Sequence, residues 1–333
     1  MTTGEPRPDP VLRAVGGWQP ARVLMTANRL GVFAVLGEDA LAAEEVAQRC
    51  QAHPRSTTLL LNACVALGFL RKEGDRYANS AAALEFLITG KPTYIGNGIK
   101  HDEWMYAVWT HLEEAVRTNR PVRHLAQPPS GADTRKEFSL AMHNLAMRTG
   151  PLLAATLDLS GRRQLFDCGG GVGTHSVFLV QRYAGLQAIV FDLPETIELA
   201  KEVIVRFGLG DRISTRAGDY FVDDLGQDND VVLLSGIVHS MGPDACRLLL
   251  EKCHRSLVSG GWVVVHEALI DPERTSPRRA ALFSLNMLVM TGQGQSYSGE
   301  DIMGLMRETG FMPLEVRSLP PPAWTSLVIG EKR

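Results

Sequence analysis

The apolar residues of roughly the first 155 positions recur at helical spacing. They predict helices over residues 20–36, 42–50 and 55–67. Two short apolar runs follow, at residues 69–71 and 76–78, and the turn-forming triplet Glu73-Gly74-Asp75 separates them. Helices followed by a small hairpin predict a mainly helical, winged-helix-like N-terminal domain.

Beyond residue 161 the pattern changes to short apolar strands that alternate with helices. Strands are predicted over residues 164–168, 188–192, 213–217, 230–235, 262–267, 314–317 and 326–331, and helices from residue 174 and over residues 195–207, 244–257, 282–290 and 299–309. Repeated strand–helix units predict the α/β class, with a mostly parallel, Rossmann-like sheet covered by helices on both faces. The last two strands are joined by a short connection, so the last strand must be antiparallel.

Composition is that of a globular protein with two domains. The chain has 333 residues, of which 45% are hydrophobic and 21% charged. A formal net charge of −3 gives no positive field for nucleic acid or anionic membranes. A winged helix would read DNA with its third helix, yet no Lys or Arg lies between Ser56 and Leu70. We therefore expect neither a nucleic-acid nor a membrane partner.

The five cysteines are widely spaced and form no Cys-x-x-Cys pair, which argues against a disulfide framework or a zinc site. Cys246 and Cys253 share one face of a predicted helix, as core residues would. The N-terminus has no basic start followed by an apolar stretch, and no apolar run approaches the ~20 residues of a membrane span. These features predict a cytoplasmic protein.

A glycine-rich turn follows the first strand of the α/β region, in Phe166-Asp167-Cys168-Gly169-Gly170-Gly171-Val172-Gly173. Glycines let the backbone approach a ligand closely, and the next helix offers free N–H groups. Asp192 ends the second strand, where a carboxylate can accept hydrogen bonds from ribose hydroxyls. Sites for NAD, FAD and S-adenosylmethionine share this geometry.

Detail separates these cofactors. A dinucleotide turn of the form G-x-G-x-x-G needs glycine where this chain has Thr174. An acid at the strand end, Asp167, suits a cofactor with an ammonium group, as methionine has, and would repel a pyrophosphate. A second acid, Asp219, follows the third strand and is placed to meet an adenine amino group. Together these features predict S-adenosylmethionine.

Four segments resemble motifs of the plant-type and bacterial small-molecule O-methyltransferases, the family of the caffeate, acetylserotonin and antibiotic- or phenazine-tailoring enzymes. The segments are residues 167–173, 190–194, 218–221 and 234–239. The resemblance spans nearly the whole chain and implies the methyltransferase form of the doubly wound sheet. It implies a cofactor site made of Asp167, Gly169, Gly171, Asp192, Leu193, Asp219, Tyr220 and Ser235.

The resemblance also implies three regions. Residues 1–95 would be a winged-helix-like dimerisation domain, residues 96–158 a helical linker that contributes to the substrate pocket, and residues 159–333 the S-adenosylmethionine-binding catalytic domain. In that family the N-terminal domains of two subunits intertwine, which implies a homodimer. Exposed apolar stripes, expected near Val23, Leu24, Leu59 and Leu60, point the same way.

Methyl transfer to a phenol requires alignment, exclusion of water and removal of the hydroxyl proton. A neutral imidazole at the carboxyl edge of the sheet is the expected base. His239 lies four residues past the fourth strand and matches the catalytic histidine of the family. Glu267 ends the fifth strand, and the resemblance implies that it holds the tautomer of that histidine.

The chain departs from the family pattern at three places. Ser240-Met241 follows the histidine in place of the usual Asp-Trp, and Ser284 replaces a common Asp. Gln295 stands where the family carries a second acid. A weaker set of charged groups leaves N-, C- or S-methylation open, as well as a non-methylating reaction such as decarboxylation or ring closure.

The substrate pocket is predicted to include Met142, Phe283, Met287 and Met290, whose adaptable side chains suit a hydroxylated aromatic or polyketide-like acceptor. No metal site is predicted, because His101 and His143 have no companion acids at ligand spacing. A rival hypothesis, a DNA-binding regulator built on the winged helix, is disfavoured by the apolar third helix.

Overall fold

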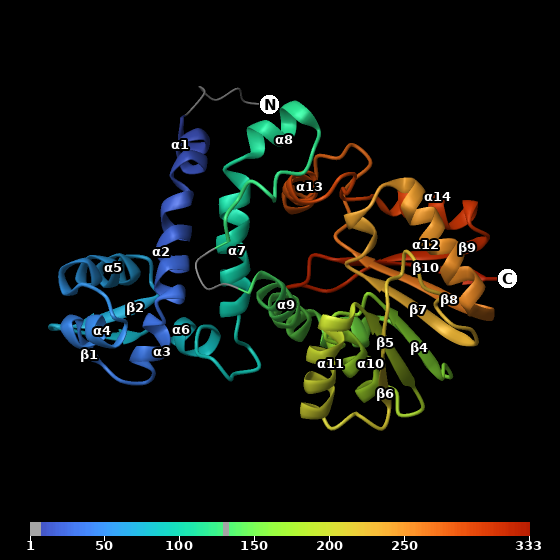
Figure 1. Cartoon of the computed structure of the whole chain (residues 1–333), viewed down its shortest axis with the longest axis horizontal. Helices are drawn as coiled ribbons and strands as arrows, with labels where there is room; N and C mark the ends of the chain where they lie inside the picture. Colours follow the sequence, from blue (N-terminus) through green and yellow to red (C-terminus); the bar gives the residue numbers. More distant parts are fainter. Residues whose placement is uncertain (1–7, 129–132) are drawn as a thin grey trace, which may run out of the picture. The chain divides into compact units, whose positions relative to one another are not determined.

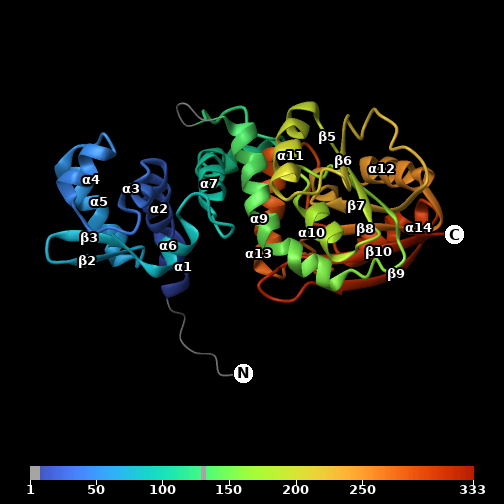
Figure 2. The same cartoon turned by 90° about the horizontal axis from the view of Figure 1, so that it is seen from below.

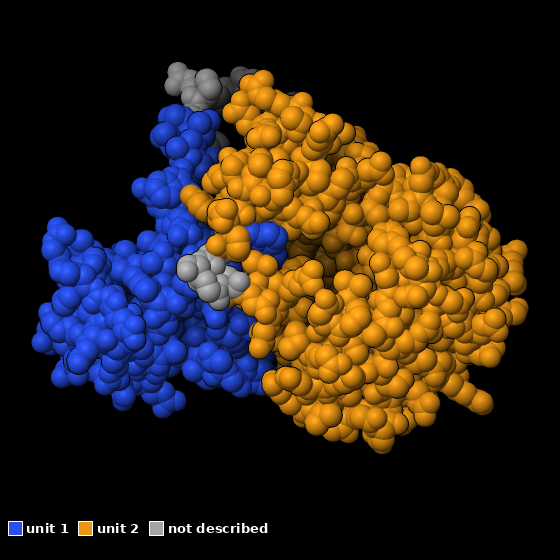
Figure 3. Space-filling view, viewed as in Figure 1, with its two compact units in different colours: residues 1–104 blue, residues 105–333 orange. Residues whose placement is uncertain are grey.

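The computed structural model describes residues 8–128 and 133–333 (Figure 1). The chain divides into two compact units, residues 1–104 and 105–333, which Figure 3 draws in different colours. Within the described ranges, no helix is long and apolar enough to cross a membrane.

The first unit is helical with a small three-stranded sheet. Its elements are α1 (Asp9–Gly16), α2 (Trp18–Arg29), α3 (Val32–Leu36), β1 (Leu41–Ala42), α4 (Ala43–Arg49), α5 (Pro54–Ala66), β2 (Leu70–Glu73), β3 (Arg76–Asn79), α6 (Ala81–Phe86) and the start of α7 (Gly96–Trp109). The strands pair antiparallel in the order β1-β3-β2. Phe33, Leu36, Leu61 and Tyr77 are almost completely buried between helices and sheet, which gives this unit its own core.

Two details of this unit differ from the sequence expectation. The single helix expected over residues 20–36 is interrupted, because Gly31 adopts the left-handed conformation with φ of 77° between α2 and α3. The expected exposed stripe is also wrong in part: Val23, Leu24 and Leu60 pack against the core, and only Leu59 stays exposed, at 57%. Helical spacing identified the apolar face but could not say that the same domain covers it.

The second unit begins with helices and continues as a doubly wound α/β domain. Its helices after α7 are α8 (Leu112–Thr118), α9 (Thr134–Thr156), α10 (Thr174–Arg182), α11 (Pro194–Arg206), the 3-10 turn η1 (Val238–Ser240), α12 (Pro243–Ser256), α13 (Arg278–Met290) and α14 (Gly299–Glu308). Its strands are β4 (Gln164–Cys168), β5 (Gln187–Asp192), β6 (Ile213–Ala217), β7 (Asn229–Ser235), β8 (Leu257–Glu267), β9 (Phe311–Ser318) and β10 (Ser326–Lys332).

The seven strands lie in the order β6-β5-β4-β7-β8-β10-β9. Strands β4 to β8 run parallel, and β10 pairs antiparallel with both β8 and β9. The predicted α/β class with an antiparallel last strand is therefore confirmed. The strand order reverses direction between β4 and β7, and in open α/β sheets the crevice at such a point binds the ligand.

Helices cover both faces of this sheet (Figure 1, Figure 2). One core cluster joins the sheet to α12 and α14, and the other joins it to α9, α10 and α11. Cys246 and Cys253 are fully buried in the first cluster, as their helical spacing predicted. The two buried faces hold the strands rigidly, so the residues at their carboxyl ends have fixed positions.

Candidate active site

The turn after β4 is built from glycines that no other residue could replace without strain. Gly169 and Gly171 have φ angles of 68° and 59°, in the left-handed region. A Cβ on Gly169 would lie 2.4 Å from Cδ1 of Ile237, whereas a Cβ on Gly171 would meet nothing within 4 Å. The turn is therefore tightly packed on one side and has open space on the other.

Asp167 lies beneath this turn and is 1% exposed. Its Oδ2 accepts a hydrogen bond of 2.6 Å from Oγ of Ser176, but its Oδ1 is buried with no partner in the described part of the chain. Burial raises the pKa of this carboxyl to about 6. Buried polar atoms are rarely left unsatisfied, so Oδ1 marks a place where a ligand can donate a hydrogen bond.

Asp192, at the end of β5, faces the same turn. Its Oδ2 accepts from the backbone N–H of Gly171 at 2.8 Å, and its Oδ1 accepts from the N–H of Leu193 at 2.7 Å. Burial raises the pKa of this carboxyl, and the two backbone bonds oppose that effect. Each carboxylate oxygen keeps a further lone pair for a ligand hydroxyl. Leu193 is 49% exposed beside it.

The segment after β6 is tied to the same place. The N–H of Gly218 donates to the carbonyl of Asp192 at 2.9 Å. Asp219 accepts from the N–H of Phe221 at 2.8 Å, which orders its carboxylate. The half-buried ring of Tyr220 would lie 3.6 Å from a Cβ on Gly169. The structure therefore brings together seven of the eight predicted cofactor residues around one turn.

Ser235 is the eighth, and its hydroxyl is already engaged. Its Oγ lies 2.9 Å from Nδ1 of His266 and 3.2 Å from Nδ1 of His175. Sequence reasoning missed both histidines. His266 pairs with Ser235 across β7 and β8, and His175 follows the glycine turn, but neither position carries a recognisable motif.

His239 and Glu267 form a hydrogen-bonded pair at the carboxyl edge. Nδ1 of His239, in η1, lies 2.8 Å from Oε2 of Glu267, and the His239 N–H donates to Oε1 at 3.3 Å. Glu267 is buried, and the side chain of His239 is 19% exposed. A carboxylate only accepts, so Nδ1 carries the proton and Nε2 carries the lone pair. This arrangement can remove a proton from a bound hydroxyl.

Backbone contacts fix the segment that carries His239. The N–H of Gln295 donates to the His239 carbonyl at 2.9 Å. A Cβ on Gly294 would lie 2.5 Å from the same carbonyl oxygen, so the two segments can approach only because residue 294 is glycine. Gln295 thus contacts the His239 segment through its backbone.

Aromatic side chains lie next to His239. Phe283, on α13, meets the imidazole edge to face at 4.8 Å between ring centroids and lies 6.0 Å from Trp324. One turn further along α13, Asn286 accepts a 2.5 Å hydrogen bond from Nε1 of Trp109. Of the predicted substrate residues, Phe283 is in contact with the histidine. Met287 and Met290 follow on α13, with Met287 buried, and Met142 lies on α9 with 36% exposed.

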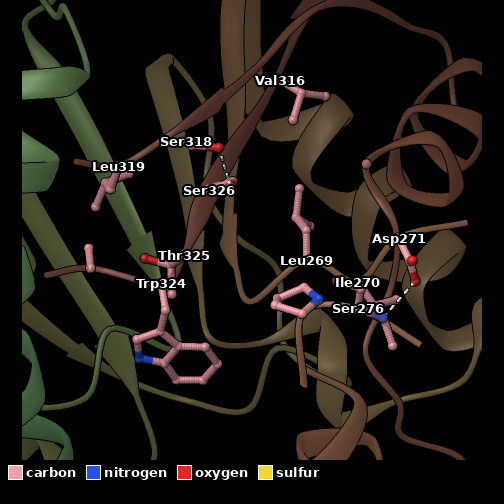
Figure 4. Close-up of a pocket in the computed structure, with 13 residues that line it drawn as sticks. Leu269, Ile270, Asp271, Ser276, Val316, Ser318, Leu319, Trp324, Thr325 and Ser326 are labelled. Atoms are coloured by element: carbon pink, nitrogen blue, oxygen red, sulfur yellow. Dashed lines mark hydrogen bonds between the residues drawn. The ribbon is translucent and has the colours of Figure 1, made fainter. Parts of the chain in front are cut away.

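A pocket of about 480 Å³ lies beside this edge (Figure 4). Leu269, Ile270, Leu319, Trp324 and Thr325 are among the residues that line it, and two of its serines, Ser318 and Ser326, bond to each other. Trp324 therefore borders the pocket and also lies near Phe283. The loop that carries Trp324, residues 319–325 between β9 and β10, held no motif that would have identified it in the sequence.

In the described ranges, no group of three or more His, Cys, Asp or Glu side chains is arranged to hold a metal ion. All five cysteines are free thiols.

Comparisons with known proteins agree with this geometry. Residues 109–312 match the model of the O-methyltransferase domain, and residues 14–89 match the O-methyltransferase dimerisation domain. The chain is 34% identical to the 3-hydroxy-5-methyl-1-naphthoate 3-O-methyltransferase of Streptomyces sahachiroi, over 96% of this chain and 93% of that one. It is 32% identical to the N,N-dimethyltransferase OxyT of Streptomyces rimosus, over 90% of each.

Among solved structures, the human N-acetylserotonin methyltransferase in complex with S-adenosylmethionine superposes with a TM-score of 0.87 at 28% identity. That match covers 100% of this chain and 99% of the human one. The fold is therefore shared along the whole length of the chain.

Proposed function

The chain belongs to the S-adenosylmethionine-dependent O-methyltransferase family, and on that premise we propose that it methylates a hydroxyl group of an aromatic or polyketide-like metabolite with His239 as the general base. The observation that carries the proposal is the 2.8 Å bond between His239 Nδ1 and Glu267 Oε2. It leaves Nε2 as the free basic atom of the imidazole.

The residues present fit the cofactor. When bound, S-adenosylmethionine supplies an electrophilic methyl group on a sulfonium sulfur. The unpartnered Oδ1 of Asp167 would accept from the ammonium group, and the backbone of Gly169 and Gly171 would border the methionine portion. Asp192 would accept from the ribose hydroxyls and Asp219 from the adenine amino group, with Leu193 and Tyr220 flanking them. Ser235 would act as a support for the turn.

The catalytic side chains act on the acceptor. His239 removes the hydroxyl proton as the oxygen attacks, and Glu267 stabilises the imidazolium that results. Phe283 and Trp324 offer flat surfaces that hold an aromatic ring and exclude water. Fixing the ring in an attacking position lowers the barrier because the entropy of alignment is lost on binding.

The acceptor is proposed to be a hydroxylated aromatic compound with fused rings, as in the hydroxynaphthoate named for the Streptomyces sahachiroi relative. Met142, Met287 and Met290 would line its far side, because unbranched thioether side chains adapt to large planar ligands.

The assembly is proposed to be a cytoplasmic homodimer without a nucleic-acid partner. Residues 14–89 match a dimerisation domain, and α1 and the start of α2 expose Val11, Leu12, Val15 and Trp18 by 52–66%. Free cysteines agree with a reducing compartment. Light scattering that gave a monomer mass at micromolar concentration would contradict the dimer.

A nitrogen acceptor is the second candidate. The relative OxyT is an N,N-dimethyltransferase, and a neutral Gln295 replaces the second acid of the family pattern. An amine needs less help from a base than a phenol does, so a site with one acid fewer than the family pattern would suffice.

Titration calorimetry with S-adenosylmethionine, with NAD as the negative control, tests the cofactor site. We expect micromolar binding of the methyl donor and its loss in Asp192→Ala. Product masses then test the reaction on matched hydroxy- and amino-naphthoates. A gain of one methyl on the hydroxy compound alone supports O-methylation, a gain on the amine alone supports the second candidate, and NAD binding would overturn the cofactor assignment.

A further inference from the structure

A part-buried chain of side-chain hydrogen bonds runs next to the glycine turn of residues 169–173, here called the cofactor turn. Its members, here called the histidine chain, are Thr325, His266, Ser235, His175 and Thr149. Thr325 Oγ1 lies 2.7 Å from His266 Nε2, and His266 Nδ1 lies 2.9 Å from Ser235 Oγ. Ser235 Oγ lies 3.2 Å from His175 Nδ1, and His175 Nε2 lies 3.2 Å from Thr149 Oγ1.

The direction of every bond in the chain follows from its last link. Thr149 donates its only hydroxyl proton to the Leu145 carbonyl at 3.2 Å, so it must accept from His175 Nε2–H. His175 Nδ1 then carries no proton and accepts a hydrogen bond from the hydroxyl of Ser235. Ser235 in turn accepts from Nδ1–H of His266, whose bare Nε2 accepts from Thr325. The two histidines are therefore opposite tautomers.

Both imidazoles must be neutral for this order to hold. Burial lowers the pKa of His175 to about 4, and burial together with repulsion from His175 lowers the pKa of His266 to about 3. The rings are in contact edge to face, 5.3 Å between centroids. No arginine or lysine takes part in the bonds of the chain. In this network the direction of each bond depends on the next.

Each member of the chain sits beside a residue of the site. Thr325 adjoins Trp324 and lines the pocket of Figure 4, and His266 precedes Glu267. Ser235 ends β7 ahead of the His239 segment, and His175 lies in the first turn of α10 after the glycines. Thr149 lies on α9, which carries Met142. The chain therefore links the loop that carries Trp324 to the cofactor turn.

We propose that the histidine chain is a positioning network that sets the cofactor turn relative to the Trp324 loop, so that Thr325 influences cofactor affinity from the acceptor side. The inference rests on the cofactor assignment in the proposed function and not on the identity of the acceptor. Thr325, His266 and His175 are positioning residues in this scheme, because they act through Ser235 and the turn.

The matched pair Thr325→Val and Thr325→Ser tests the proposal. Valine keeps the shape and removes the hydroxyl, whereas serine keeps the hydroxyl. We expect calorimetry to show S-adenosylmethionine bound about fivefold more weakly by Thr325→Val, the effect of roughly one hydrogen bond, and unchanged binding by Thr325→Ser. Equal cofactor affinity in all three proteins, with any loss confined to thermal stability, would overturn the positioning role.

Tautomers give a readout that a purely structural role would not require. ¹⁵N spectra of the imidazoles should show His175 protonated at Nε2 and His266 at Nδ1 in the wild type. In Thr325→Val the His266 signals should lose this single tautomer. The opposite tautomers in the wild type would overturn the deduced direction of the chain.

A double-mutant cycle at the two ends separates the inference from the function it rests on. Thr149→Val and Thr325→Val share no contact, so independent sites would give additive losses of cofactor affinity. A cooperative chain predicts that the double variant loses little more than either single one. If the wild type fails to bind S-adenosylmethionine, the proposed function fails; if it binds and the losses are additive, only the histidine chain fails.

Discussion

Two acids lie at the carboxyl ends of strands of the same sheet and both are buried, yet their hydrogen bonding differs. Asp167, the last residue but one of β4, keeps one oxygen without a partner in the described part of the chain, and burial raises its pKa to about 6. Glu267, at the end of β8, has both oxygens bonded to His239, one to the ring and one to the backbone N–H. The first acid is arranged to receive a ligand, and the second is arranged to hold the side chain of His239, the proposed base.

The difference shows how a ligand site can be distinguished from a supporting contact. Leaving a buried polar atom unsatisfied costs about 1–3 kcal/mol, so a fold keeps such an atom where binding offsets the cost. A satisfied pair stabilises the protein by itself and fixes a geometry. Mutations at the glycine turn should therefore change the affinity for the cofactor, and mutations of His239 or Glu267 should change kcat.

The largest expected effect lies at the catalytic edge. His239→Asn removes the general base and should lower kcat about 10³-fold, within the range for loss of acid–base catalysis. Cofactor affinity should stay within about twofold of the wild type, because His239 is not among the residues placed around the glycine turn. Steady-state assays and calorimetry on the same preparation measure both quantities. A variant that kept more than about a tenth of the activity would contradict the role of His239.

Glu267→Gln should have the next largest effect. The amide keeps the volume but loses the charge that stabilises the imidazolium and selects the Nδ1–H tautomer. We expect kcat to fall about 10²-fold with little change in KM for either substrate. Single-turnover rates would isolate the chemical step. A change confined to KM would instead place Glu267 in substrate binding.

Asp167→Asn should affect cofactor binding and not turnover. Loss of a charged acceptor should weaken S-adenosylmethionine binding about 10- to 100-fold, and kcat at saturating cofactor should change little. Without cofactor the variant should be more stable at pH 7.5, by on the order of 1–2 kcal/mol, because a buried charge is removed. Denaturant unfolding without and with cofactor measures the gain in stability and the loss of cofactor affinity. For Glu267→Gln we expect the opposite, a lower stability without cofactor and an unchanged cofactor affinity.

The smallest effects concern pH and stability without cofactor. The folded-state pKa of His175 and of His266 lies below the ordinary value of 6.5, so between about pH 6.5 and 4 only the unfolded chain gains these protons. Stability should fall as pH falls through that window. Asp167 has a raised pKa of about 6, so its contribution runs the other way and stability gains as pH falls from about 6 toward 4.

Two variants separate these opposing contributions. His266→Gln should flatten the acid loss of stability, and Asp167→Asn should steepen it, because each removes one contribution. Unfolding free energies measured in denaturant at several pH values between 4 and 7.5 test this. Identical pH slopes in both variants and the wild type would show that neither group titrates on unfolding.

Much of this arrangement could be predicted from particular residues. The glycines, Asp167, Asp192 and His239 stand at strand ends, and the carboxyl ends of parallel strands share one edge, so local pattern was enough to group them. The break at Gly31 and the packing of the half-buried Val23, Leu24 and Leu60 against the core were not predictable in this way, because a helical pattern does not say what covers a face. The prediction that Ser235 contacts the cofactor directly did not foresee that two histidines bond to its hydroxyl.

Short-range spacing along single strands and turns was enough to predict the fold class, the family and the chemical types at the sheet edge. Tertiary contacts were needed to show which acid is satisfied and which is not, and they bring together Thr325, His266, Ser235, His175 and Thr149. Those residues come from two strands, two helices and the loop before β10. A hydrogen bond forms only where the two partners are placed to within a few tenths of an ångström, and no local sequence pattern carries that information.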